Sequence, residues 1–414
     1  MQFFRPGDQD EARDIVAWAA QDKVPLAIKG AGSKAGLGYA VEAAHGLDLS
    51  GLAGILEYEP SELFLTARAG TPLSEIARLL DEHDQMLAFE PHGWQGLLAG
   101  DIGAGPTIGG VIACNIAGPR RLTAGAARDH FLGFAGINGR GEAYKAGAKV
   151  VKNVTGYDLC KLMAGSMGTL TVLTEITVKV LPRPETSCTL AASGLDDRAA
   201  LALLAEALNG PNEVTAAAHL PAAAAARSAV AAVAAVAVAA TAQAGRAVTA
   251  LRLEGPVPSV EFRRGEVEAL LRRAGAEPLY LSHADSLAFW QDVGRGGCLL
   301  PSLSPDTALW RICTAPSQAA AVAEAAGAVD HFYDWAGGLL WLATDAPGGA
   351  AGPIRDAVAR YGGHATLMRA PSPLREEVQP FQPVPAALDA LHARVKQGFD
   401  PLGILNPGRM QRGL

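Results

Sequence analysis

The chain has 414 residues, and 35 Lys and Arg against 42 Asp and Glu give it a net charge of −7. Its 49% hydrophobic and 19% charged residues exclude a disordered or collagen-like protein. The acidic balance argues against binding to nucleic acid and against polybasic attachment to anionic lipid, and the length predicts two or three domains.

The cysteines indicate reduced thiols and no metal site. The five of them show no CxxC or zinc-like spacing, and they are Cys114, Cys160, Cys188, Cys298 and Cys313. An odd, sparse set in a long chain is typical of a cytoplasmic protein. The first residues, MQFFRPGDQDEARD, soon become acidic and contain no apolar segment, which predicts no signal peptide.

The first 90 residues predict short strands alternating with helices. We expect strands over 2–5 and 24–29, the second running directly into glycines, and a helix over 8–20 between them. Further strands are expected in LDLSGL, ILEYEP and LFLTARAG, followed by a helix over 71–84.

Residues 90–141 have glycines every few positions and almost no periodicity. A long irregular segment inside a compact domain is usually functional. Regular strands are expected again over 131–137 and 169–180. The sequence Pro182-Arg183-Pro184 then predicts a linker.

After this linker the pattern predicts an α+β domain with an antiparallel sheet. The expected strands cover 188–192, 214–219, 249–253, 309–313, 339–344 and 365–369, and the expected helices cover 197–208, 260–274, 318–326 and 354–361. An Ala-rich insertion at about 221–247 contains an uncharged run over 228–245. Because alanine gains little on transfer into lipid, we expect a loosely attached surface helix there, with a membrane span as the alternative.

Three glycine-rich segments carry the candidate binding residues. The first, GAGSKA at 30–35, matches a Rossmann phosphate loop, but Gly36 and Gly38 would weaken the helix that such a loop requires, so a plain turn stays open as the alternative. The second is PTIGGVIACN at 106–115. Its small residues allow a flat ligand to approach the main chain, although a glycine-rich loop packed for its own sake remains the alternative. The third joins KNVTGYDL at 152–159 to GSMGTLTV at 165–172, and alone it would be a turn entering a strand.

In this order the three segments resemble the FAD-binding domain of the vanillyl-alcohol oxidase / p-cresol methylhydroxylase (PCMH) type. Within that family, KVVKNVTGYDLCKLMAGSMGTLTVLTEITVKVLPRPE and the terminal FDPLGILNPGRM resemble the E subunits of glycolate oxidases. The resemblance covers residues 1–190 and the tail well, and the middle of the chain only in single strands.

The resemblance implies an α+β fold with three parts. A PCMH-type FAD-binding domain of two α/β subdomains would cover 1–184, and an antiparallel α+β cap domain would cover 185–370. A C-terminal helix and tail, 371–414, would return to the FAD domain.

The resemblance also assigns roles to individual residues. A cradle for the FAD pyrophosphate would be made by Gly30, Ala31, Gly32, Ser33 and Lys34. The ribityl chain and the ring would be lined by Thr107, Gly109, Gly110, Ala113, Asn115, Gly118 and Asp129, while Gly168 and Val172 would meet the adenosine half. Covalent relatives have a histidine where this chain has Ser33, so the resemblance implies non-covalent FAD.

A paired-histidine motif is absent from the sequence. Catalytic subunits of this family that oxidise 2-hydroxy acids carry such a motif in the cap, whereas the cap histidines here, His219, His283, His331 and His364, stand singly in the sequence. We therefore assign no catalytic residue. The resemblance implies an FAD-binding subunit of a glycolate oxidase that converts glycolate to glyoxylate.

In that complex the chain would pass electrons between a catalytic FAD subunit and an iron–sulfur subunit. The iron–sulfur cluster must come from the partner, because this chain has no four-cysteine motif. We expect no transmembrane segment and a cytoplasmic location, with attachment to the inner face of the cell membrane only through the complex.

Two alternative functions stay open. The first is an autonomous FAD-dependent oxidoreductase of another small hydroxy acid or alcohol, acting through Tyr157, His364 or Arg409. The second is a binding module that has lost its flavin.

Overall fold

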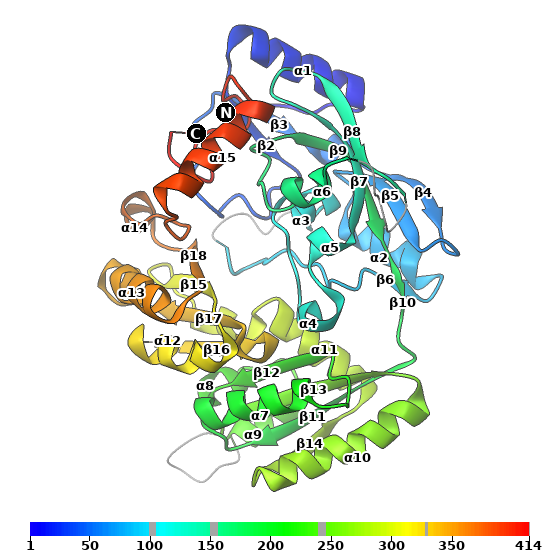
Figure 1. The fold of residues 1–414 in the computed structure, drawn as a ribbon, viewed down its shortest axis with the longest axis vertical. Coiled ribbons are helices and arrows are strands. Elements are labelled where there is room, and N and C mark those ends of the chain that lie inside the picture. Colours follow the sequence, from blue (N-terminus) through cyan, green and yellow to red (C-terminus); the bar gives the residue numbers. More distant parts are fainter. Residues whose placement is uncertain (99–104, 150–155, 239–245, 328–329, 414) are drawn as a thin grey trace. The chain divides into compact units, whose positions relative to one another are not determined.

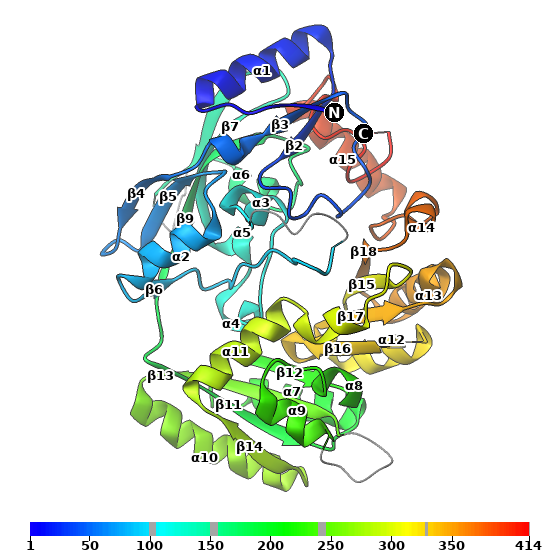
Figure 2. The same ribbon diagram turned by 180° about the vertical axis from the view of Figure 1, so that it is seen from behind.

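The computed structural model describes residues 1–98, 105–149, 156–238, 246–327 and 330–413, which form two compact units (Figures 1 and 2). The first unit contains Met1–Gly118, Gly125–Arg183 and Pro383–Leu414, and the second contains Pro119–Ala124 and Pro184–Gln382. The predicted linker at 182–184 contains the boundary. Two bounds differ from the expected ones: the short segment Pro119–Ala124 belongs to the second unit, and the tail returns to the first unit at Pro383 rather than at residue 371.

The described residues of the first unit form three sheets. Its strands are β1 (Gln2–Phe4), β2 (Leu26–Lys29), β3 (His45–Asp48), β4 (Ile55–Glu59), β5 (Phe64–Arg68), β6 (Gln85–Met86), β7 (Phe131–Ile137), β8 (Ala143–Gly147), β9 (Val172–Lys179) and β10 (Leu181–Pro182). A parallel sheet has the order β1-β3-β2, and an antiparallel sheet has the order β4-β5-β9-β7-β8. The short strands β6 and β10 pair with each other.

The helices of the first unit are α1 (Gln9–Asp22), α2 (Leu73–Asp81), α3 (Ile108–Ala113), α5 (Ala127–His130), α6 (Leu159–Met163) and α15 (Ala386–Phe399). The predicted helix over 8–20 is confirmed as α1, which begins after Asp8, whose carboxylate accepts a hydrogen bond from the Glu11 amide at 2.9 Å. Val16 of α1 is fully buried in one core cluster with Leu26 of β2 and Ile137 of β7.

The second unit is built on one eight-stranded sheet. Its strands are β11 (Thr186–Ser193), β12 (Ala216–Leu220), β13 (Val248–Gly255), β14 (Glu277–Leu281), β15 (Ala308–Cys313), β16 (Asp330–Asp334), β17 (Leu339–Thr344) and β18 (His364–Arg369). Its helices are α4 (Arg121–Ala124), α7 (Asp197–Asn209), α8 (Ala222–Ala225), α9 (Ala231–Val238), α10 (Val257–Arg273), α11 (His283–Gly294), α12 (Ala319–Ala325), α13 (Ala351–Tyr361) and α14 (Ser372–Glu377). Every pairing is antiparallel, so the expected antiparallel α+β architecture is confirmed.

This sheet consists of two copies of one βαββαβ motif. The first copy is β11–α7–β12–β13–α10–β14 with the order β14-β11-β13-β12, and the second is β15–α12–β16–β17–α13–β18 with the order β16-β17-β15-β18. Both orders are those of the ferredoxin-like split βαβ motif, read from opposite ends. The copies join at β12 and β16, and the helices α7, α10, α12 and α13 contribute Leu204, Val267, Val322 and Ile354 to one core.

The Ala-rich insertion forms two short helices, α8 and α9. Val233 and Ala237 of α9 are buried, so this helix packs more closely than the expected loosely attached one, and residues 239–245 lie outside the described residues. None of the helices that the structure describes is long and apolar enough to cross a membrane.

The junction between the two copies contains a partly buried polar cluster around Asp197. At the start of α7, its carboxylate accepts hydrogen bonds from His219 Nε2 at 3.2 Å, His331 Nε2 at 2.9 Å and the Tyr333 hydroxyl at 2.7 Å. Burial raises the pKa of Asp197, but these hydrogen bonds outweigh burial and hold it well below its usual value. His219 pairs directly with Tyr333 across β12 and β16, so the cluster bridges the two copies.

Asp197→Asn is expected to lower the free energy of unfolding by about 1–3 kcal/mol at neutral pH, because one of the two acceptor oxygens becomes an NH2 donor facing groups that donate to it. A carboxyl whose pKa is lower in the folded state stabilises the fold above its unfolded value of about 3.9 and loses that effect as the pH falls. The difference between wild type and variant should therefore shrink below about pH 4. Denaturant unfolding between pH 3 and 8 measures this, with the exposed Asp306→Asn as control. A difference that grows on acidification would contradict the assignment.

Candidate functional site

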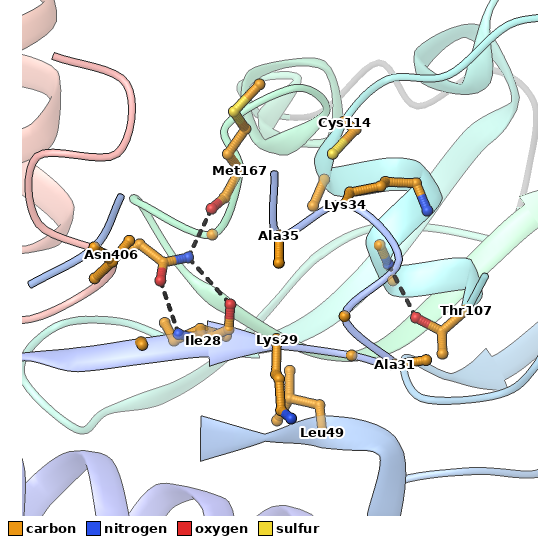
Figure 3. A pocket seen from close by; sticks show the side chains of 18 of the residues that line it. Ile28, Lys29, Ala31, Lys34, Ala35, Leu49, Thr107, Cys114, Met167 and Asn406 are labelled. Atoms are coloured by element: carbon orange, nitrogen blue, oxygen red, sulfur yellow. Dashed lines mark hydrogen bonds between the residues drawn. The ribbon is translucent and has the colours of Figure 1, made fainter. Parts of the chain in front are cut away.

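A cavity of about 340 Å³ lies in the first unit, and segments far apart in the sequence form its walls (Figure 3). Ten of the predicted site residues line it: Gly30, Ala31, Gly32, Ser33, Lys34, Thr107, Gly109, Gly110, Ala113 and Gly168. Parts of all three glycine-rich segments therefore meet at one place.

The first loop follows β2 as a series of turns. β2 ends at Lys29, and residues 30–39 form bends and turns with no helix, so the Rossmann alternative is wrong. Gly32 has a φ of +81°, which favours glycine, and a Cβ added to Gly30 would lie 2.4 Å from Thr107 Oγ1. The two glycines thus allow the loop to turn sharply and to lie directly against the second segment.

The second segment contains the short helix α3. Thr107 precedes this helix, and its Oγ1 accepts a hydrogen bond from the Gly110 amide at 3.3 Å. Gly109 packs against the main chain of Ala69, where a Cβ would lie 2.7 Å from the carbonyl oxygen, so close packing accounts for this glycine. A Cβ on Gly110 would instead lie 3.7 Å from Lys34 Nζ. Packing alone therefore explains part of the segment, and Gly110 leaves room beside the lysine.

Lys34 is the most unusual group at the cavity. The residue is only 6% exposed, and its ammonium donates to Ser33 Oγ at 3.0 Å. Burial lowers the pKa of this ammonium, and across the described ranges no carboxylate forms an ion pair with it. A buried charge without a counter-charge is costly, so the cavity is suited to an anionic ligand at this point.

Backbone groups of the same loop reinforce this preference. In the part of the chain that the structure describes, no residue accepts a hydrogen bond from the amides of Gly32, Ser33 or Lys34. All three residues line the cavity. Successive amide donors in a glycine-rich turn are a common binding arrangement for phosphate oxygens.

The lining also contains residues that were not among the predicted binding residues, and three of them carry polar groups used below: Cys114, Asn406 and Arg409. Figure 3 shows the Cys114 and Lys34 side chains beside each other; burial raises the pKa of the Cys114 thiol although Lys34 and Arg409 oppose this. The sequence indicates Arg409 only as a catalytic candidate of the autonomous oxidoreductase. Asn406 and Arg409 belong to the terminal FDPLGILNPGRM segment. The resemblance of this segment to glycolate oxidase E subunits was the one signal that could have indicated a role at the cavity, because nothing in the sequence spacing places the segment beside residue 30.

The other four predicted residues lie outside the lining of the cavity. Asn115 Oδ1 accepts from the Arg128 amide at 3.0 Å, and Asp129 Oδ2 accepts from the Ala126 amide at 2.9 Å, so both shape the turn before α5. The Gly118 amide donates to Phe89 O at 2.9 Å, and Val172 is fully buried in the core. Their roles toward FAD stay predictions, and residues 152–155 of the third segment lie outside the described residues.

The sequence predicts that the histidines of the second unit stand apart from one another, but two of them lie close together in the structure. His219 and His331 meet at Asp197, because β12 and β16 are neighbours in the sheet. The Ser187 amide donates to His283 Nδ1 at 3.0 Å, and His364 is exposed on β18. Within the described ranges, no group of three or more His, Cys, Asp or Glu side chains is placed to hold a metal ion.

Comparison with known sequences agrees with this geometry. Residues 2–147 match the family model described as an FAD binding domain. The chain is 36% identical over 392 residues to glycolate oxidase subunit GlcE of Escherichia coli, covering 95% of this chain and 94% of that protein. It is 26% identical to glycolate oxidase subunit GlcD of Bacillus subtilis, covering 98% and 87% of the two chains.

Comparison with solved structures shows the fold. The crystal structure of p-cresol methylhydroxylase with substrate bound matches with a TM-score of 0.74 at 15% identity, covering 99% of this chain and 88% of that one. Alkyldihydroxyacetonephosphate synthase matches with a TM-score of 0.70 at 16% identity, covering 98% and 76%. The predicted PCMH-type fold is confirmed.

Proposed function

Because the chain belongs to the family of glycolate oxidase subunit GlcE, whose members are FAD-binding oxidoreductases, we propose that it is the FAD-carrying subunit of a glycolate-oxidising complex and relays electrons there. Glycolate and the complex come from the names of the relatives, GlcE and GlcD.

The buried Lys34 ammonium carries the assignment of FAD to this cavity. Lys34 is 6% exposed and lies beside amide donors of the glycine loop. This setting suits the negative charge of a pyrophosphate. In the proposal Lys34 and the amides of 32–34 bind the pyrophosphate, and the absence of a side chain at Gly110 leaves room for the cofactor beside Lys34. When bound, FAD supplies the electron-accepting and electron-donating chemistry. Ser33 offers no imidazole for a covalent link, so the proposed FAD is non-covalent.

The composition of the cavity wall supports a relay rather than an independent oxidase. The titratable side chains that line it in the described chain are Lys29, Lys34, Cys114 and Arg409. Removal of a hydroxyl proton requires a positioned base, and imidazole and carboxylate are the usual ones. The described lining contains neither, so the proposal places the oxidation of glycolate on a catalytic partner subunit.

The proposal also includes an iron–sulfur partner. The five cysteines of this chain are free and have no cluster-binding spacing, so electrons leaving FAD need an external acceptor. The cytoplasmic location, with attachment to the membrane only through the partners, stays a prediction. Cell fractionation with and without the partner subunits tests it.

Anaerobic titration of the isolated, FAD-loaded chain with glycolate tests the division of labour. We expect negligible bleaching of the flavin absorbance with this chain alone, and turnover once a catalytic flavoprotein subunit and an iron–sulfur subunit are added. Acid precipitation of the same sample should leave the flavin in the supernatant. Rapid bleaching of the isolated chain would favour the autonomous oxidoreductase, and failure to take up FAD would favour a binding module.

A further inference from the structure

Residues 404–406 lie alongside β2 and pair with it through an isolated β-bridge. The Leu26 amide donates to Ile404 O at 2.8 Å, and the Asn406 amide donates to Leu26 O at 3.0 Å. Leu26 and Leu405 form this parallel bridge, so residues 404–406 lie against the β2 edge of the β1-β3-β2 sheet. This places the terminal segment 404–409 at the root of the glycine loop.

Asn406 connects two walls of the cavity. Its side chain accepts from the Ile28 amide at 2.7 Å through Oδ1, and its Nδ2 donates to Met167 O at 2.8 Å (Figure 3). The residue is 2% exposed, and both its amide oxygen and its amide nitrogen are used. A Cβ on Gly168 would lie 2.9 Å from Nδ2, so the loop at 165–169 approaches Asn406 as closely as a glycine allows.

Arg409 fixes the glycine loop itself. Its Nη2 donates to Lys34 O at 2.9 Å, and its own carbonyl accepts from the Tyr39 amide at 3.0 Å. The two bonds hold the loop at Lys34 and again at Tyr39. Because the carbonyl of Lys34 is held, the position of the buried ammonium depends on the terminal segment.

A buried ion pair supports the turn that precedes this segment. Lys396 Nζ contacts Asp400 Oδ2 at 2.5 Å and donates to Thr169 O at 2.8 Å and to Leu405 O at 2.9 Å. Asp400 Oδ2 in turn accepts from the Leu405 amide at 2.8 Å. The terminal segment is therefore anchored at both its start and its end.

We propose that Asn406 and Arg409 are positioning residues that hold the walls of the cofactor cavity together and set the rate at which FAD leaves. The inference rests on the proposed function only in taking FAD as the occupant. The three elements that the segment joins, β2, the glycine loop and the 165–169 loop, all line the cavity. Release of a cofactor enclosed by these elements requires at least one of them to move, and the side chains of Asn406 and Arg409 resist that movement.

The test is the rate of FAD release from the full-length holoprotein, followed by the fluorescence of free FAD after dilution. Asn406→Asp keeps the size of the side chain but replaces the Nδ2 donor by an oxygen facing Met167 O, and Arg409→Gln removes the bond to Lys34 O. Each variant should release FAD about tenfold faster, the effect of losing one such hydrogen bond. The control is Arg394→Gln on the exposed side of α15, which should release FAD at the wild-type rate.

Thermal unfolding of the FAD-free proteins separates positioning from general stabilisation. A purely structural role would lower the melting temperature of both variants and leave FAD release at the wild-type rate, which would overturn the inference. If Asn406→Asp does not fold, Arg409→Gln alone decides between the two outcomes. Absence of FAD binding in the wild type would instead overturn the proposed function, so the two failures are distinguishable.

Discussion

Lys34→Met is expected to purify as a folded protein that binds FAD roughly ten- to a hundredfold more weakly than wild type, the effect of losing a hydrogen bond to a charged group. Methionine fills a similar volume but removes the ammonium that is 6% exposed and bonded only to Ser33 Oγ in the described chain. The same change removes a desolvated charge from the FAD-free protein. The FAD-free variant should therefore unfold at the same temperature as the FAD-free wild type or above it.

Lys29→Met is the matched control for this experiment, because Lys29 lines the same cavity with its charge already compensated. Its ammonium lies 3.5 Å from Asp48 Oδ2 and 3.9 Å from the centroid of the Phe3 ring. Titration of the FAD-free proteins with FAD, followed by quenching of flavin fluorescence, measures both affinities. Equal losses in the two variants would show that general positive charge attracts the ligand, and wild-type affinity in Lys34→Met would refute the pyrophosphate assignment.

Glu254→Gln is expected to destabilise the second unit by roughly 3–5 kcal/mol, the cost of breaking a buried ion pair. The carboxylate accepts from Arg120 Nε at 2.9 Å and Nη2 at 2.5 Å and also lies 3.3 Å from Arg252 Nε. Its side chain is 4% exposed, and those of Arg120 and Arg252 are 11% and 1% exposed. Burial raises the pKa of Glu254, but the two arginines outweigh it and keep the carboxyl ionised.

The control for Glu254→Gln is Glu268→Gln, which breaks an exposed pair with Arg272 on α10 and should cost less than about 1 kcal/mol. Denaturant unfolding followed by tryptophan fluorescence measures both. A similarly small loss of unfolding free energy in the two variants would mean that the two arginines do not depend on the carboxylate of Glu254. In that case the pair would not be what attaches residues 119–124 to the second unit.

The sequence predicted those elements whose own residues already show that they are buried. Strand β11 and helix α7 were expected from their apolar residues, most of which are buried in the structure. Strand β14 was missed: EPLYL carries Pro278, which is tolerated at the edge of a sheet, and it pairs only with β11. Strand β16, DHFYD, begins and ends with Asp, so its burial depends on neighbours far away in sequence. Without these two strands the duplicated βαββαβ motif could not be recognised.

The cavity was predictable where one loop contains both the glycines and the charge, as at 30–34. It was not predictable where contact depends on topology. Asn406 reaches Ile28 because residues 404–406 pair with β2, and His219 reaches Asp197 because β12 turns back beside α7. No periodicity marks such contacts, since each is set by the order of strands in a sheet.

The segment 404–409 also determines when the first unit can be completed during synthesis. The second unit needs only Pro119–Ala124 and Pro184–Gln382, all of which leave the ribosome before Pro383. The first unit contains Met1–Gly118, yet residues 404–406, which pair with β2 through a bridge, are made only after the whole second unit. The domain begun first is thus finished last, and a nascent chain would carry a completed second unit beside a cofactor cavity that still lacks Asn406 and Arg409.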